Sequence, residues 1–201
     1  VVVVVVVGVI MMRRFFSNGN AFQKVYEFRT YSVQPQHFPA FLALTNEKIS
    51  MRTEYSKMLG YWATEIGGVN EVVHLWEYDS LAHRQGVRVA LGGAKSWNEE
   101  YMAKMRPMLS SQANILLGSV GDEDVEECTE KGGIYLIGGM NENTAQDDKM
   151  VGLFQSTYGD VQGTNYLGIW RFQGMEEVDN VRQKNFTWSK LVIPTPFSPL
   201  Q

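Results

Sequence analysis

The sequence predicts an α+β fold made of one complete strand–helix–strand–strand–helix–strand unit and a second, shortened copy. Between residues 25 and 120, the hydrophobic pattern switches between the two-residue period of strands and the 3.6-residue period of helices. The segment of residues 57–88 also returns in similar form at residues 149–182. This element order favours a ferredoxin-like sandwich, a four-stranded antiparallel sheet with helices on one face.

The composition is that of a globular chain. Of its 201 residues, 44% are hydrophobic and 12% aromatic, which is enough for a packed core. The net charge of −4, without a cluster of Lys and Arg beyond the N-terminal segment, removes the attraction that dominates nucleic-acid binding, so no nucleic-acid partner is expected. A single cysteine, Cys128, cannot form an internal disulfide, which indicates an inert thiol in a reducing compartment.

Residues 1–24 are expected to be a targeting segment or a disordered tail outside the fold. The opening apolar run of residues 1–12 is shorter than the ~18 to 20 residues that span a bilayer, so we expect no transmembrane helix. From Met11 onward the segment carries Arg13 and Arg14 and has no acid before Glu27, as mitochondrial presequences do. Mitochondrial localisation is therefore expected, with a cytoplasmic protein as the alternative.

The first unit, residues 25–120, opens with a strand. VYEFRTYSV is rich in β-branched and aromatic residues, and its alternation places Glu27 and Arg29 on one face. Opposite charges that are buried on one face must pair, so we expect a charged network inside a barrel or at a dimer contact, unless that face is open to water. Residues 38–49 then follow at helical spacing.

A hairpin and a second helix complete the first unit. MLGYWATEI and NEVVHLWEY have strand composition and are joined by two glycines at residues 67–68, the residue type that supplies positive φ in a tight turn. Asp79 and Ser80 can cap the next helix, and Ser96 with Glu99 has the spacing of a capping box for its continuation. NILLGSV is expected to be the last strand of the unit.

A linker and the shortened repeat make up the rest of the chain. Residues 121–133 contain six acids and almost no apolar side chain, which predicts a solvated linker. In residues 134–201, the first strand lies 109 residues after its counterpart but the second strand only 92, so 17 residues, about one helix, are missing. Because 19 residues follow Arg182, we expect this repeat to keep its hairpin and little else.

Four segments carry a family resemblance: YEFRTY at residues 26–31, RTEYSKMLGYW at 52–62, HLWEYDSLAHRQGVRVAL at 74–91, and the terminal IPTPFSPLQ. Together they resemble the NIPSNAP family, most closely its third-type branch. The resemblance implies two tandem dimeric α/β-barrel repeats whose sheets pack face to face. It also implies a mitochondrial interaction or scaffold protein, linked to mitophagy signalling or vesicular transport, without catalytic residues or a cofactor.

Specific side chains in these segments are the expected site residues. The interface or family-motif positions are Glu27, Arg29, Arg52, Trp62, His74, Trp76, Arg84 and Arg88. The alternative function is a small-ligand or heme-binding, oxygenase-like domain on the same fold, with His83 as the cofactor-binding residue because it lies one turn into a helix. The histidines lack metal-ligand spacing, so no metal site is expected.

An uncovered sheet face predicts association. A second repeat without its first helix is expected to cover the apolar face of the first sheet only in part, and exposed apolar patches of that size mark interfaces. Protein partners are therefore expected, together with a homodimer or an intramolecular pseudo-dimer. Five Trp and ten Met residues also suit a small apolar ligand.

Overall fold

The computed structural model describes residues 24–120, 125, 130–143, 148–159, 162–179 and 186–201. Cys128, Arg182 and the predicted targeting segment up to residue 23 lie outside the described residues. Within the described residues no helix is both long enough and apolar enough to cross a membrane.

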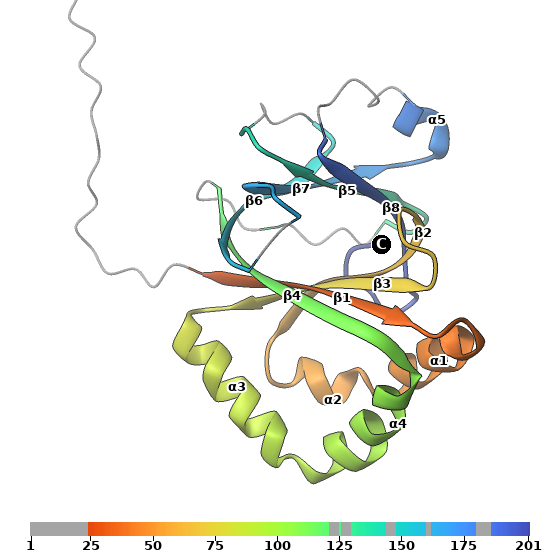
Figure 1. Cartoon of the computed structure of the whole chain (residues 1–201), viewed down its shortest axis with the longest axis vertical. Helices are drawn as coiled ribbons and strands as arrows, with labels where there is room; N and C mark the ends of the chain where they lie inside the picture. The colour runs from red at the N-terminus through yellow and green to blue at the C-terminus, as the bar shows by residue number, and fades with distance from the viewer. Residues whose placement is uncertain (1–23, 121–124, 126–129, 144–147, 160–161, 180–185) are drawn as a thin grey trace, which may run out of the picture.

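Eight antiparallel strands form a closed barrel in the described chain (Figure 1). The strands are β1 (Val25–Val33), β2 (Lys57–Ile66), β3 (Glu71–Tyr78), β4 (Leu109–Ser119), β5 (Ile134–Met140), β6 (Met150–Tyr158), β7 (Tyr166–Phe172) and β8 (Trp188–Pro194). The first sheet has the order β4-β1-β3-β2, and the second sheet has the order β8-β5-β7-β6. Pairing of β2 with β8 and of β4 with β6 joins the two sheets into one barrel.

Helices cover the outer face of the first sheet. They are η1 (Pro35–His37), α1 (Phe38–Lys48), α2 (Ser50–Thr53), α3 (Leu81–Gly93), the π-helical η2 (Trp97–Met102), α4 (Ala103–Met105) and η3 (Arg106–Met108). Figure 1 shows α1 to α4 on the side of this sheet that faces away from the second sheet. Beyond the second sheet lies the short α5 (Met175–Asp179).

Local sequence signals explain several of these elements. Gly67 adopts φ 95° between β2 and β3, as the predicted tight turn requires. The Ser80 side chain accepts a hydrogen bond from the backbone N–H of His83, which caps α3 as predicted. The predicted capping box at Ser96 is wrong. Ser96 has helical dihedral angles and makes no capping bond, because the chain there continues into the π-helical turn of η2.

Large side chains from both sheets fill the barrel interior. Tyr26 and Trp62 from the first sheet pack with Tyr135 and Phe154 from the second, and each is at most 1% exposed. Leu200 of the C-terminal tail is buried in the same cluster. Val125 is buried there too, although its segment was predicted to be a solvated linker. The linker prediction missed that a single apolar side chain within an acidic run can still enter the core.

The C-terminal half of the chain contributes more than the predicted hairpin. Its last 14 residues include β8, which pairs with both β2 and β5 and closes the barrel. The prediction that only a hairpin remains, with the first sheet partly uncovered, is therefore wrong. Trp62 is 0% exposed inside the barrel, so it cannot be a contact between two chains. Within the described chain, the second sheet therefore covers the inner face of the first sheet.

The two hairpins share a structural detail. β2 has a register shift between Met58 and Gly60, and β6 has one between Met150 and Gly152. In each strand the glycine leaves room for the aromatic side chain two residues later, which is Trp62 in β2. A Cβ atom at Gly60 would lie 2.0 Å from the Trp62 ring.

This packing predicts opposite effects for two glycine-to-alanine substitutions. Gly60→Ala should lower the free energy of unfolding by about 1–3 kcal/mol, because the new methyl group overpacks a core in which Trp62 has no room to move. Gly86→Ala, at a position of α3 with no atom within 4 Å of the new Cβ, should instead raise it by about 0.5–1 kcal/mol. Chemical denaturation of both variants measures this contrast, and equal effects would contradict it.

Candidate functional site

A cavity of about 250 Å³ lies between the outer face of the first sheet and its helices. Among its lining residues are six of the predicted motif residues: Glu27, Arg29, Arg52, His74, Trp76 and Arg88. Other side chains in the lining were not predicted as site residues, among them Tyr31, Tyr61, Tyr78, Trp97, Tyr101 and Arg106. Strand pairing explains the grouping, since Glu27 lies opposite Trp76 and Arg29 opposite His74 across β1 and β3.

The carboxylate of Glu27 is the centre of a buried network. Arg84 donates two hydrogen bonds to it, from Nε at 3.1 Å and from Nη2 at 2.7 Å. Arg29 donates from Nη1 at 3.0 Å, Asn114 from Nδ2 at 2.6 Å and the Tyr78 hydroxyl at 3.1 Å. The predicted pairing of Glu27 with Arg29 is thus present, on the helix-covered outer face rather than inside the barrel or at a dimer contact.

The network keeps Glu27 ionised. Burial is the largest single influence and on its own would raise the carboxyl pKa, but the hydrogen bond from Arg84 and the charges of Arg29 and Arg84 together outweigh it. The result is a Glu27 pKa lowered to about 2. At neutral pH this carboxylate has no proton to donate, and its lone pairs are occupied by donors.

A third guanidinium, that of Arg52, lies next to the Glu27 network. Arg52 donates to the Ser56 hydroxyl at 2.7 Å and to the Tyr78 hydroxyl at 2.8 Å, and its guanidinium carbon lies 4.0 Å from the centre of the Trp76 ring. Its side chain is buried, and no carboxylate of the described chain forms an ion pair with it. The Tyr78 hydroxyl connects Arg52 to Glu27, because it accepts a hydrogen bond from the Arg52 guanidinium and donates one to the Glu27 carboxylate.

His74 is buried and neutral. The indole N–H of Trp76 donates to its Nδ1 at 2.5 Å, and its ring stacks on Tyr61 with centroids 4.7 Å apart. Burial lowers the His74 pKa well below its usual range, and the positive charge of Arg29 adds to that effect. A neutral imidazole that accepts at Nδ1 carries its hydrogen on Nε2, so Nε2 is a hydrogen-bond donor.

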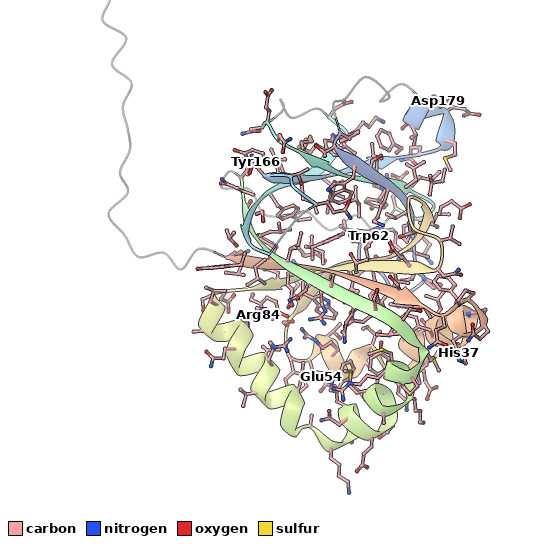
Figure 2. All side chains as sticks on the ribbon, in the orientation of Figure 1. His37, Glu54, Trp62, Arg84, Tyr166 and Asp179 are labelled. Atoms are coloured by element: carbon pink, nitrogen blue, oxygen red, sulfur yellow. The ribbon has the colours of Figure 1, made fainter. Side chains whose placement is uncertain are left out.

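Three predicted residues do not line the cavity. Figure 2 shows Arg84 reaching from α3 towards the first sheet, where it binds Glu27, and Trp62 lying between the two sheets. His83 lies at the start of α3. Its Nδ1 accepts from the backbone N–H of Asp79 at 3.1 Å, and the Asp79 carboxylate lies at the same distance.

Sequence reasoning missed two important cavity residues. Tyr61 alternates with Trp62 in β2, and this alternation is the signal that could have placed it on the outer face. Arg106 carries no such signal, because it follows a π-helical turn that breaks the helical period. Both line the cavity beside the predicted arginines.

The cavity offers positive charge and hydrogen-bond donors. Four arginines line it, Arg29, Arg52, Arg88 and Arg106, against the single carboxylate of Glu27. In the described part of the chain no group of three or more His, Cys, Asp or Glu side chains could hold a metal ion. The arrangement is suited to binding an electron-rich group rather than to abstracting a proton.

The Glu27 network predicts a pH-dependent stability. Glu27→Gln should lower the free energy of unfolding at pH 7 by about 3–5 kcal/mol, because it leaves buried arginines without their counter-charge. Since the folded-state pKa is about 2 against an ordinary 4.5, this stabilisation is complete above pH 4.5 and is lost as the pH falls towards 2. The difference between wild type and variant should therefore shrink over that interval by roughly 3 kcal/mol.

Denaturation curves from pH 2 to 7 measure this difference. Glu99→Gln, which removes an exposed carboxylate from η2, is the matched control and should leave the curve of stability against pH unchanged within about 0.5 kcal/mol. A Glu27→Gln variant whose deficit is constant across the range would contradict the account of the network.

Comparison with known proteins places the chain in a family. A family model described as NIPSNAP matches residues 26–121. The human Protein NipSnap homolog 3B is 31% identical in an alignment of 211 positions, gaps included, that covers 88% of this chain and 85% of the human protein.

Solved structures with little sequence identity share the fold over most of the chain. An anthrone oxidase-like protein is similar with a TM-score of 0.57 and 6% identity, covering 89% of this chain and 94% of its own. A mutant chlorite dismutase from Candidatus Nitrospira defluvii, in complex with cyanide, has a TM-score of 0.53 and 10% identity, covering 86% and 91%. At such identities only the fold is shared. The sequence match over most of both chains settles the family: this chain belongs to the NIPSNAP family.

Proposed function

We propose that this chain is a NIPSNAP-type interaction or scaffold protein that works by association with other proteins in mitochondria. Membership of the NIPSNAP family carries the proposal. The state of Glu27, the one carboxylate of the cavity, is compatible with it, because this group is ionised and accepts five hydrogen bonds. Such a group stabilises the fold rather than moving protons. Mitophagy signalling and vesicular transport are the processes that the family resemblance implies.

We infer in addition that the chain is a tandem of unequal repeats. Residues 25–120 are the first repeat, residues 121–133 the linker, and residues 134–201 a reduced second repeat. The equivalent strand order of the two sheets and the matching register shifts in β2 and β6 support this division. A homodimer stays a prediction, and the contact would have to lie outside the barrel interior.

A second candidate function is the binding of a small ligand. The cavity under the first sheet favours it, and its volume of about 250 Å³ lies just below the ~300 Å³ at which sites for drug-sized molecules begin. Heme is a poor candidate for this ligand, because the volume is small and His83 does not line the cavity. The composition predicted a small apolar ligand, but the cavity lining contains four arginines and Glu27, which favour a polar ligand instead.

Chemical cross-linking of the untagged full chain in isolated mitochondria tests the association role. Exposed lysines such as Lys95 and Lys104 should form reproducible cross-links to the same few proteins, and a urea-treated sample should lose them. Mass spectrometry of the immunoprecipitated chain identifies these links. A folded, abundant chain with no intermolecular cross-link would overturn the proposal.

The localisation part of the proposal predicts import. A fusion of residues 11–24 to a fluorescent reporter should enter mitochondria, because the segment contains Arg13 and Arg14 and no acid. Replacing both arginines by glutamine in the same fusion should abolish import. Diffuse cytosolic fluorescence of the unaltered fusion would support the cytoplasmic alternative instead.

A further inference from the structure

The cavity holds buried positive charge without enough negative charge to balance it. Arg29 and Arg84 bind Glu27 directly, and Arg52 is linked to it only through the Tyr78 hydroxyl, so one carboxylate faces three guanidinium groups. At the exposed rim Arg88 and Arg106 add two more cations, and neither forms an ion pair with any residue of the described chain. Unbalanced charge in a partly desolvated site favours the entry of an anion.

Deep in the cavity, two donors have no acceptor. The side chains of Tyr61 and His74 are 1% and 4% exposed, and neither Tyr61 Oη nor His74 Nε2 has a hydrogen-bond partner. The Thr45 hydroxyl lies near enough to influence the Tyr61 pKa, but it donates to the Phe41 carbonyl and contacts Tyr101. Unpartnered buried donors are costly, and a ligand oxygen that accepts from them removes that cost.

Arg29 supplies a third donor of the same kind. Its Nε–H is buried and has no hydrogen-bond partner, while its Nη1 binds Glu27. Arg29, Tyr61 and His74 all line the same cavity, and all three free positions are donors. A carboxylate has two oxygens with about four acceptor positions and matches such a set.

The remaining walls are aromatic. Tyr31, Trp76, Tyr78, Trp97 and Tyr101 line the cavity, and the rings of Trp97 and Tyr101 stack with centroids 4.5 Å apart. Aromatic walls favour a flat apolar body that can pack against ring faces and edges. The small volume limits that body to about one ring.

We propose that this cavity binds a small aromatic carboxylate, with the carboxylate accepting from Tyr61, His74 and Arg29 and the ring lying among the aromatic walls. Arg88 and Arg106 at the rim attract the anion from solution. The inference deepens the second candidate function and rests on it, but it is independent of the association role.

Isothermal titration calorimetry of the full chain with benzoate and with its neutral isostere benzamide tests the charge requirement. Benzoate should bind saturably with one site per chain, and benzamide at least about tenfold more weakly, because it cannot balance the arginines. No saturable benzoate binding up to about 10 mM would overturn the proposal. Equally tight binding of benzamide would contradict the claim that the ligand must be an anion, although the cavity would still be a small-ligand site.

Two tyrosine variants test the donor set. Tyr61→Phe removes a hydroxyl without a protein partner, so the thermal midpoint of the unliganded chain should stay or rise while benzoate binds at least about tenfold more weakly. Tyr101→Phe is the matched control, because it removes a hydroxyl of the same cavity that Thr45 engages. It should lower the thermal midpoint and change benzoate affinity less than about twofold. Unchanged benzoate affinity in Tyr61→Phe would contradict the proposed carboxylate position.

The rim arginines are tested by charge. Arg106→Gln should weaken benzoate binding about threefold or more at low salt, with a smaller effect at 0.5 M salt, because an exposed cation acts through a screened field. Lys95→Gln removes an exposed cation that does not line the cavity and should have no such effect. Equal effects of the two variants would mean that Arg106 acts only through the net charge of the protein, which would contradict its proposed role at the rim of the cavity. Cross-links to partner proteins should persist in all these variants, which separates failure of this proposal from failure of the association role.

Discussion

Closure of the barrel by a single chain is the constraint on which the rest of the structure depends. The first sheet carries large aromatic side chains on the face away from its helices, and these must be covered. The second sheet covers them, through the seams that join β2 to β8 and β4 to β6. The C-terminal tail strengthens the first seam, because the Ser198 hydroxyl accepts from the Tyr61 backbone N–H at 2.9 Å.

Closure also decides where a ligand can bind. Trp62, Tyr135 and Phe154 pack in the interior. A second cavity, of about 260 Å³, remains beside this core and is lined by Phe28, Ile115 and Trp188 among others. Among the residues that the structure describes, long helices cover only the first sheet, and the spaces between those helices and the strands are lined from both sides. Glu27 fixes this layer by tying α3 to β1 through Arg84. The same carboxylate neutralises one guanidinium among several, which leaves the cavity cationic and accessible to an anion.

Much of the first half could be predicted from sequence, because its signals are local. Strand alternation placed Glu27 beside Arg29, and a side chain with cap chemistry, Ser80, marked the start of α3. The rest depends on contacts distant in sequence. β8 forms a strand because it pairs with both β2 and β5. Arg84 pairs with Glu27, 57 residues away in the sequence, because α3 folds back over β1. The cavity combines strand and helix residues whose combined spacing has no sequence period. Local patterns could therefore place single side chains such as Tyr61 on the outer face, but they could not reveal the cavity as a whole.

Native-state hydrogen exchange at the two seams tests single-chain closure most directly. If the two sheets form one cooperative barrel, the backbone amides paired between β2 and β8 and between β4 and β6 should exchange only through global unfolding. Their opening free energies should then equal those of the β1–β3 pairs. Seam amides that open several kcal/mol more easily than β1 and β3 would mean that the second sheet detaches as a separate unit, which would contradict this account.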